Sequence, residues 1–308
     1  MIKPFVSVVI PTYERAAKLE RLLSALEKQT YKNFETIVVD DGSTDTTGEV
    51  AKNRPVKYVR LPHRGRVYAK NYGAKEAKGS VVLFLDDDVI TSPKLVHEHA
   101  RLHGPSDVGV VGGSLVAPRQ HVDVADQQYE DHLLKRIWDI VVYLGMKNET
   151  GRILPNGVTV DNFEQKGGVR EVNCVPGGNM SVRKSAFEEV GGFDLCYYGV
   201  AYREETDLCV RIQRRGYRVI FNPNAVVLHE RRSASSLRYC FERSDNELYF
   251  VLKNSLIIKN RYWLSYLMWD VKKGINVCGI ANLPCWYKAK INAIRRVRRH
   301  YISERLAS

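Results

Sequence analysis

The sequence of 308 residues lacks the features that mark membrane-spanning, secreted and zinc-binding proteins. It contains no run of about 18 uncharged apolar residues, which a transmembrane helix needs. The first residues, Met-Ile-Lys-Pro, lead into an apolar strand pattern instead of the core of a signal peptide. The six cysteines form no C-x-x-C pair and lie mostly in apolar segments, which indicates reduced structural thiols. We therefore expect a cytoplasmic protein without a zinc site or a disulfide framework.

The two common glycine-rich phosphate cradles are also absent. No G-x-G-x-x-G follows the first apolar segment, and no G-x-x-x-x-G-K-S/T occurs. Carboxylates follow the strand-like segments instead, at Asp40-Asp41 and at Asp86-Asp87-Asp88. If the chain binds phosphates, these carboxylates favour neutralisation by a metal ion and not by backbone N–H groups.

Positive charge is in excess, but only at one end of the chain. The net charge is +12, and residues 231–308 alone carry +11, from 16 Lys and Arg against 5 Asp and Glu. Such an asymmetry indicates a nucleic-acid or anionic-membrane partner for the basic end and says nothing about the chemistry of the remainder. The length and the 44% of hydrophobic residues suit one large α/β domain with an appendage.

The acidic triplet Asp86-Asp87-Asp88 follows a short apolar run, Val81–Leu85, which is typical of a strand buried on both faces. Three adjacent anions repel one another. Holding them together in a fold requires hydrogen bonds, basic neighbours or a hard divalent cation. The structural alternative is a solvated acidic loop.

Strand and helix patterns alternate around this triplet, which predicts a mostly parallel sheet flanked by helices. Ligands of such sheets bind beyond the carboxyl ends of the strands, where an aromatic turn, an acidic pair and the acidic triplet would meet. The expected strands are Val6–Ile10, ended by Pro11, and Glu35–Val39, Val56–Leu61, Val81–Leu85, Val108–Leu115 and Ala225–Leu228. The expected helices span residues 16–30, 69–78, 93–104, 129–144 and 204–216.

The last of these helices carries candidate catalytic acids. Helical spacing places Glu205 on an apolar stripe, whereas Glu204 and Asp207 fall on the polar side. A partly desolvated carboxylate in the first turn of a helix can serve as a general base, so Glu205 is the first candidate and Glu204 its rival. The alternative is a carboxylate that only complements the helix dipole.

Eight segments in order resemble the family 2 glycosyltransferases. Those are inverting, metal-dependent enzymes of the GT-A fold that use nucleotide-diphospho-sugars. The resemblance covers residues 5–230, and its specificity comes from the order of motifs that are individually weak. The segments are Ser7–Tyr13, Val38–Asp45, Ala69–Gly73, Phe84–Asp88, Gly177–Ser181, Gly191–Asp194, Glu204–Leu208 and His229.

The resemblance implies roles for residues at the strand ends. Asp41 would accept a hydrogen bond from the nucleobase, with uracil favoured, and the turn Pro11-Thr12-Tyr13 would pack beside the base. The triplet matches the D-x-D motif, with Asp86 toward the ribose, Asp88 on Mg²⁺ or Mn²⁺, and Asp87 counted with the nucleotide-sugar-binding residues.

Three further positions take their roles from the same resemblance. Gly178 would offer unhindered backbone near the sugar, although an ordinary glycine turn is the alternative. Lys70 stands where relatives often carry Arg, which keeps the charge of a nucleotide-sugar-binding residue but loses its planar fork. His229 would join Asp88 as a metal ligand, because imidazole is compatible with Mn²⁺, although a lone histidine at a strand end is often structural.

These expectations combine into an enzyme. Residues 1–230 would form the catalytic domain, with a nucleotide-binding half at 1–116 and an acceptor half at 117–230, and residues 231–308 a basic helical extension. Glu205 would deprotonate the acceptor hydroxyl in a single inverting displacement onto a glycan or a lipid-linked acceptor. The alternatives are a nucleic-acid-binding protein and a non-catalytic scaffold at a membrane surface. We expect no nucleic-acid partner, since the basic charge lies outside the domain that carries the motifs.

The basic extension carries two candidate membrane-binding segments. Residues 248–271 combine aromatic and aliphatic residues, Phe250 and Val251 among them, with Lys253, Lys259 and Arg261, and residues 288–305 add a second basic segment. These segments predict helices lying in the interface of an anionic cytoplasmic membrane surface. The alternative is a pair of helices packed on the catalytic domain.

Overall fold

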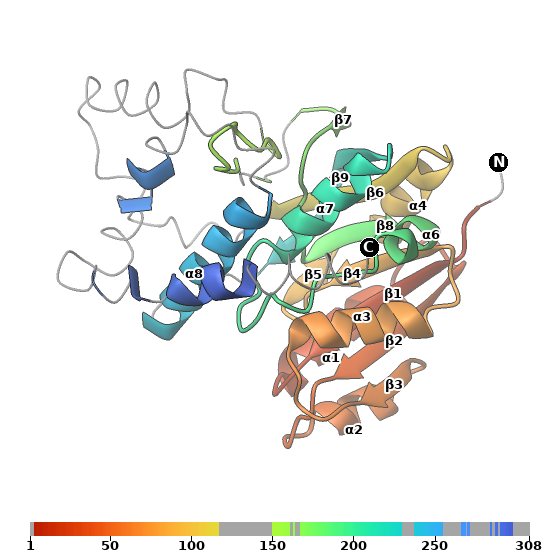
Figure 1. Ribbon diagram of the computed structural model, residues 1–308. Helices are drawn as coiled ribbons and strands as arrows, with labels where there is room; N and C mark the ends of the chain where they lie inside the picture. Colours follow the sequence, from red (N-terminus) through yellow and green to blue (C-terminus); the bar gives the residue numbers. More distant parts are fainter. Residues whose placement is uncertain are drawn as a thin grey trace, which may run out of the picture. The chain divides into compact units, whose positions relative to one another are not determined.

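The computed structural model describes residues 3–116, 150–160, 163, 167–229, 237–254, 266–268, 270–271, 284, 287–288 and 290–297 (Figure 1). The chain divides into two compact units. The first comprises Met1–Pro118, Asp161–Leu195 and Glu204–Arg231, and the second Arg119–Val160, Cys196–Arg203 and Arg232–Ser308. The second unit therefore contains two segments that precede the expected boundary at residue 230.

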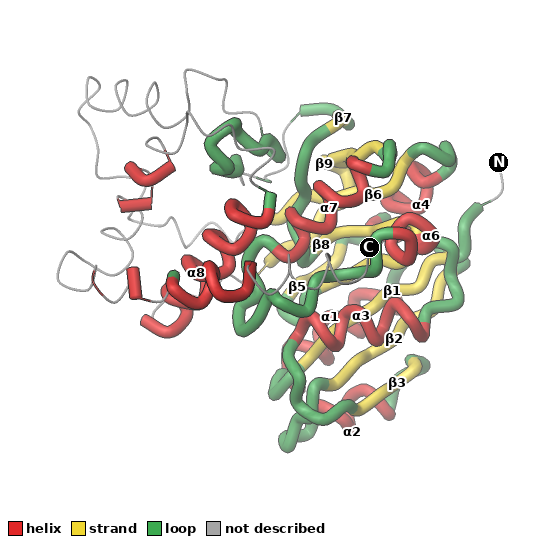
Figure 2. Tube along the Cα trace, in the orientation of Figure 1, coloured by secondary structure: helices red, strands yellow, loops and turns green. Residues whose placement is uncertain are grey.

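One sheet organises the first unit, and in the described part of the chain it has nine strands (Figure 2). The order is β3-β2-β1-β4-β8-β6-β9-β5, and β7 pairs with β9. Strands β3, β2, β1 and β4 are parallel, whereas β8 runs antiparallel to β4 and β6. The strands are β1 Val6–Thr12, β2 Phe34–Asp40, β3 Lys57–Arg60, β4 Val81–Leu85, β5 Val89–Thr91, β6 Val108–Val116, β7 Arg170–Glu171, β8 Asn179–Arg183 and β9 Arg218–His229.

Helices cover both faces of this sheet, so its central strands are largely buried and mostly apolar. On one face Leu19 and Leu22 of α1 pack with Val8 of β1 in a continuous core. On the other, α3 approaches β1 so closely that a Cβ on Gly73 would lie 2.3 Å from a methyl of Val9. The helices of this unit are α1 Ala16–Glu27, α2 Thr47–Lys52, α3 Arg66–Glu76, α4 Leu95–Ala100 with the 3₁₀ turn Arg101–His103, α6 Lys184–Glu189 and α7 Glu204–Arg214.

Two strands are longer than expected, and each contains a proline. β1 continues through Pro11 to Thr12, because its pairing with β4 ends at Val9 and the missing N–H costs no bond on that side. β9 begins at Arg218 instead of Ala225. Its register with β6 shifts between the pairs Gly113–Asn222 and Ser114–Val226, so Pro223 lies in a bulge where no ladder bond is needed.

The second unit contains α8 (Leu237–Lys253), which is buried on more than one face. Tyr249, Phe250 and Val251 are at most 1% exposed, so the expectation that Phe250 and Val251 face a membrane is wrong. Glu247 forms an ion pair with Arg203 at 3.0 Å, in which both side chains are 2% exposed. Within the described residues, no helix combines the length and the apolarity that crossing a bilayer requires. The expected helix at 129–144 lies outside the described residues.

A buried histidine pair ties α4 and the following 3₁₀ turn to the sheet. His99 contacts Asn179 Oδ1 through Nε2 at 2.9 Å and Ser181 Oγ through Nδ1 at 2.8 Å, and His103 Nε2 lies 2.8 Å from the same hydroxyl. Burial lowers the pKa of His99 to about 4 and that of His103 to about 3. Both rings are therefore neutral in the folded protein at physiological pH.

This pair should make the fold acid-sensitive. Since both folded pKa values lie below the unfolded value near 6.5, the unfolded chain binds more protons once the pH falls below 6.5. The free energy of unfolding should then drop by about 1.4 kcal/mol per pH unit for each histidine, down to the folded pKa. Urea unfolding between pH 7 and 4 measures this slope. Replacing His99 by Gln should flatten it.

Candidate active site

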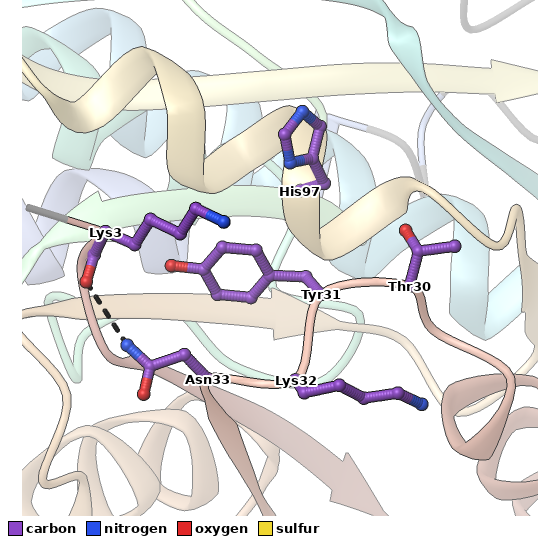
Figure 3. A pocket seen from close by; sticks show the side chains of 6 residues that line it. All are labelled: Lys3, Thr30, Tyr31, Lys32, Asn33 and His97. Atoms are coloured by element: carbon purple, nitrogen blue, oxygen red, sulfur yellow. Dashed lines mark hydrogen bonds between the residues drawn. The ribbon is translucent and has the colours of Figure 1, made fainter. Parts of the chain in front are cut away.

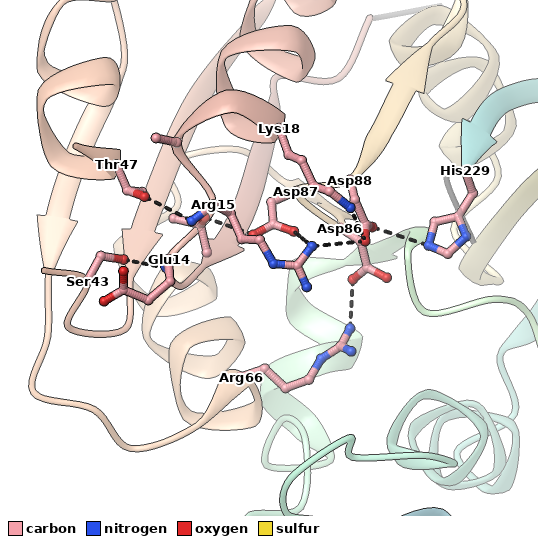
Figure 4. Close-up of polar contacts among 12 residues, drawn as sticks. Glu14, Arg15, Lys18, Ser43, Thr47, Arg66, Asp86, Asp87, Asp88 and His229 are labelled. Carbon is pink, nitrogen blue, oxygen red and sulfur yellow. Dashed lines mark hydrogen bonds and ion pairs between the residues drawn. The ribbon is translucent and has the colours of Figure 1, made fainter. Parts of the chain in front are cut away.

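The acidic triplet lies at the carboxyl end of β4, as expected, and a strand pairing brings His229 beside it (Figure 4). Val89 of β5 is the register partner of His229 in β9, so the residue before Val89 meets the imidazole. Asp88 Oδ1 lies 3.2 Å from His229 Nε2. One ligand atom each from Asp86, Asp88 and His229 fall within 4.8 Å of one another.

This donor set fits a divalent cation. Carboxylate oxygens suit hard cations, and an added imidazole is compatible with Mn²⁺. All three side chains are partly exposed, which leaves room for ligands from outside the protein. The structure thus joins the two predicted ligands, Asp88 and His229, and adds Asp86 to the same group.

Basic side chains hold the triplet together electrostatically. Arg15 Nη1 lies 3.3 Å and Lys18 Nζ 3.6 Å from Asp88 Oδ2. Burial would raise the pKa of Asp88, but the hydrogen bond and charge of His229, with Lys18 and Arg15, outweigh it and lower that pKa below the usual range. The carboxylate is therefore ionised and available to a cation.

Asp87 lies apart from this group. Its Oδ2 accepts a hydrogen bond from Thr12 Oγ1 at 2.8 Å, and its side chain faces β1. Burial raises the pKa of Asp87 to about 6, although Arg15 and Thr12 oppose the shift. The alternation of side chains along an extended chain explains why the middle carboxylate diverges from its neighbours.

Arg66, at the start of α3, connects the triplet with helix α7. Its Nη2 lies 2.7 Å from Asp86 Oδ1 and its Nε 3.8 Å from Glu204 Oε1. Asp86 first, then Glu204 and Glu205, raise the pKa of Arg66, while burial opposes them. The sequence analysis did not identify Arg66, Arg15 or Lys18 as site residues. Two signals could have identified Arg66: the triplet needs basic neighbours, and residues 63–66 form a basic turn.

Of the three acids in the first turn of α7, Glu205 is partly buried as expected, whereas Glu204 and Asp207 lie in different environments from those that were expected. Glu204 is 1% exposed and pairs with the fully buried Lys70 at 2.7 Å. The prediction of a polar face is wrong for Glu204 and also for Asp207, which is fully buried and accepts from Arg211 Nε at 2.8 Å. Glu205 is half-buried. Helix α7 is enclosed on several sides, so the amphipathic pattern did not identify its exposed face.

The two glycines before β8 bring the backbone close to the carboxylates of Asp86 and Glu205. A Cβ on Gly178 would lie 2.5 Å from Asp86 Oδ2, and one on Gly177 would lie 3.3 Å from the side chain of Glu205. Asn179, which follows, is architectural: its Nδ2 donates to the carbonyls of Ser114 and Ala225. Any side chain at position 178 would displace the Asp86 carboxylate, because its Cβ would clash with Oδ2.

Asp41 and Tyr13 meet at the ends of β2 and β1. The carboxylate of Asp41 is 3% exposed and accepts hydrogen bonds from the backbone N–H groups of Arg64 and Gly65, at 2.8 and 2.9 Å. His63 lies 2.9 Å from the same carboxylate. The ring of Tyr13, 43% exposed, lies against that of His63 with 4.3 Å between their centroids. Pro11 and Thr12 are buried within β1.

A separate hollow lies beside Tyr31, between the segments that lead into β1 and β2 (Figure 3). Exposed side chains, among them Lys3, Lys32 and His97, form most of its lining. None of the predicted site residues contributes to it. The carboxylates at the opposite ends of these strands are therefore the candidate active site.

Known proteins share this sequence pattern. A family profile described as "Glycosyl transferase family 2" matches residues 7–191. Validoxylamine A glucosyltransferase from Streptomyces hygroscopicus subsp. jinggangensis is 30% identical over 279 residues, which cover 84% of this chain and 63% of that protein. The chain thus spans about three fifths of the length of this curated relative.

Solved structures share the fold. A mannosyltransferase from Pyrobaculum calidifontis, in complex with GDP-Man and Mn²⁺, matches 100% of this chain and 81% of its own with a TM-score of 0.58 at 17% identity. TarS 1–349 from S. aureus, in complex with UDP, matches 95% of this chain and 80% of its own with a TM-score of 0.62 at 16% identity. These likenesses confirm the expected GT-A fold.

Proposed function

This chain belongs to glycosyltransferase family 2, and we propose that it transfers a sugar from a nucleotide-diphosphate sugar to an acceptor hydroxyl with inversion at the anomeric carbon. One observation carries this proposal. The carboxylates of Asp86 and Asp88 and the imidazole of His229 converge at the end of β4, and Arg66 connects Asp86 with the start of α7. Such a site can bind a diphosphate next to a side chain that acts as a general base.

Asp88 and His229, with Asp86, are the residues that would hold Mn²⁺ or Mg²⁺. When bound, such a cation offsets the negative charge that develops on the diphosphate leaving group as the glycosidic bond breaks. Because Gly178 has no side chain, the backbone lies close to Asp86, and a sugar can bind next to the Asp86 carboxylate. Arg66 fixes Asp86 by its contact at 2.7 Å.

Glu205 is the proposed general base. Its carboxylate takes the proton of the acceptor hydroxyl while that oxygen forms a bond to the anomeric carbon and the bond to the diphosphate breaks. This single displacement inverts the anomeric centre and needs no nucleophile from the chain. Glu204 suits the role less well, because its carboxylate is enclosed and already paired with Lys70.

The donor base is proposed to lie between Tyr13 and Asp41, and uracil is the favoured base. The exposed ring of Tyr13 offers a stacking surface beside His63. Asp41 Oδ1 accepts the backbone N–H group of Arg64 and keeps a further lone pair for a base N–H, whereas Oδ2 accepts that of Gly65 and also contacts His63. The structural neighbour in complex with UDP supports a uridine nucleotide as donor. Because another neighbour is in complex with GDP-Man, a guanosine nucleotide is the alternative that a binding test should include.

The acceptor is proposed to be a glycan or a lipid-linked sugar. Its binding half was expected at residues 117–230, of which residues 117–149 lie outside the described part of the chain. A cytoplasmic location stays a prediction.

A thermal-shift screen tests the donor proposal. A ligand that binds only the folded protein raises the melting temperature, by the equivalent of about 2.7 kcal/mol at 100 times its Kd. We expect UDP with Mn²⁺ to raise the melting temperature by several degrees, and GDP or UDP without a cation to raise it less. If no nucleoside diphosphate stabilises the protein with or without Mn²⁺, the proposed function is wrong.

A further inference from the structure

Two helical segments in the second unit bury charged side chains and expose most of their large apolar side chains. The first consists of residues 266–268 and 270–271, and the second of residues 287–288 and 290–297. Helices of soluble proteins show the opposite pattern, with an apolar stripe toward the core and polar residues toward water. The inversion requires an explanation.

The inward side of the first segment is polar. Tyr266 and Asp270 are 1% and 2% exposed, and they are four residues apart, hence on one face of a helix. Leu267, Met268 and Val271, in contrast, are 48%, 38% and 37% exposed. The aliphatic side chains of this segment therefore point away from the interior of the unit.

The second segment repeats the pattern. Lys290, Ala293 and Arg296 recur at three-residue intervals and face inward, where Lys290 pairs with Asp270 and Arg296 with Asp245 of α8. The outward stripe has helical spacing and consists of Tyr287, Ile291 and Ile294, which are 38%, 47% and 57% exposed.

The buried charges fix this orientation. Lys290 and Asp270 join the two segments directly, with side chains 8% and 2% exposed. Arg296 also donates to the Cys196 carbonyl, and its guanidinium lies 4.6 Å from the centre of the Tyr249 ring. Rotating the second segment to bury its isoleucines would break these contacts and leave several charges unpaired, which is costly. The apolar surface is thus held outward by the ion pairs behind it.

The exposed charges beside this surface have one sign. Lys288 and Arg295 are exposed and each follows a residue of the outward stripe, and the described residues of the two segments carry no exposed acid, since Asp270 is paired inside. A surface of aliphatic side chains and a tyrosine, flanked by cations, suits the boundary between acyl chains and anionic headgroups.

We propose that the exposed side chains of these two segments, Leu267, Met268, Val271, Tyr287, Lys288, Ile291, Ile294 and Arg295, here called the outward apolar face, dock on an anionic lipid bilayer. The inference rests on burial and charge in the second unit and does not depend on the proposed transferase activity. It replaces the sequence-based expectation in two respects. Phe250 and Val251 are internal, and Arg296 is committed to Asp245, so none of these three contributes to docking.

Co-sedimentation of the full chain with vesicles tests the proposal. With vesicles of equal parts phosphatidylcholine and phosphatidylglycerol at low salt, we expect the protein to pellet, and with pure phosphatidylcholine to pellet much less. Replacing both Ile291 and Ile294 by Ser should weaken binding roughly tenfold or more, because exposed apolar area drives insertion. Replacing Lys288 and Arg295 by Gln should weaken it roughly fivefold per charge and reduce its dependence on salt.

Matched variants of the first unit serve as controls. Leu195 is 61% exposed, and Leu195→Ser removes a comparable apolar side chain elsewhere. Lys28→Gln with Lys32→Gln removes two exposed charges elsewhere. Both controls should bind vesicles as the unaltered chain does, and all variants should melt at similar temperatures.

Three results would overturn the proposal. The first is a chain that stays in the supernatant with anionic vesicles at low salt. The second is an isoleucine double variant that binds as well as the unaltered chain, or a control variant that loses as much. The third is a dimer, seen by sedimentation velocity without lipid, that the isoleucine changes dissociate while vesicle binding persists, since a second copy would then cover the face.

Discussion

Replacing Glu205 by Gln should lower turnover by a factor of about 10² or more while donor binding stays nearly unchanged. The substitution keeps the size of the side chain and removes only its capacity to accept a proton. Gln can still lie against Gly177, as the carboxylate does, so the local packing should persist. Single-turnover kinetics with a UDP-sugar, together with calorimetric titration of UDP and Mn²⁺, separates the loss of chemistry from any loss of binding.

Glu204→Gln is the informative comparison, because the structure predicts a different kind of damage. It leaves the ammonium of Lys70 enclosed without its charged partner, and breaking a buried ion pair in this way costs about 3–5 kcal/mol of stability. We therefore expect a lower melting temperature for Glu204→Gln, with more turnover per folded molecule than Glu205→Gln retains. A stable Glu204→Gln protein without activity, beside an active Glu205→Gln protein, would assign the base to Glu204.

Replacing Asp88 by Ala should abolish the Mn²⁺-dependent part of UDP binding. Asp88 supplies one of the three atoms of the candidate metal group and orients His229 across 3.2 Å. Its loss also leaves Arg15 and Lys18 without their closest described acid, so weak cation-independent binding of UDP through these two side chains can remain. Titration of UDP in the presence and absence of Mn²⁺ distinguishes the two components.

Asp87→Ala provides the matched control for Asp88→Ala. The Asp87 carboxylate faces Thr12 and lies outside the metal group, so its removal should change UDP affinity far less and leave the requirement for Mn²⁺ intact. Melting curves should show both variants folded. An Asp88→Ala protein that still binds UDP in a Mn²⁺-dependent manner at the original affinity would refute the ligand assignment.

Local pattern in the sequence determined the framework of the first unit. The apolar run before Asp86 specified a buried strand, because a strand that is buried on both faces has a continuous run of apolar residues. The leucines of α1 specified a helix for the same reason, since their spacing is the period of its buried face. Once strands and helices alternated, the meeting of Tyr13, Asp41 and the triplet at one edge followed from the geometry of a parallel sheet.

Only the tertiary structure decided which side chains act together. His229 meets Asp88 because β5 pairs with β9 in one register, a contact between residues 141 positions apart that no local pattern encodes. Glu204 is buried because Lys70, from another helix, neutralises it, and helical periodicity cannot anticipate a partner of that kind. The inverted faces near Asp270 and Lys290 have the same origin. Local periodicity identifies the two faces of a helix, but the long-range charges that surround it determine which of them turns inward.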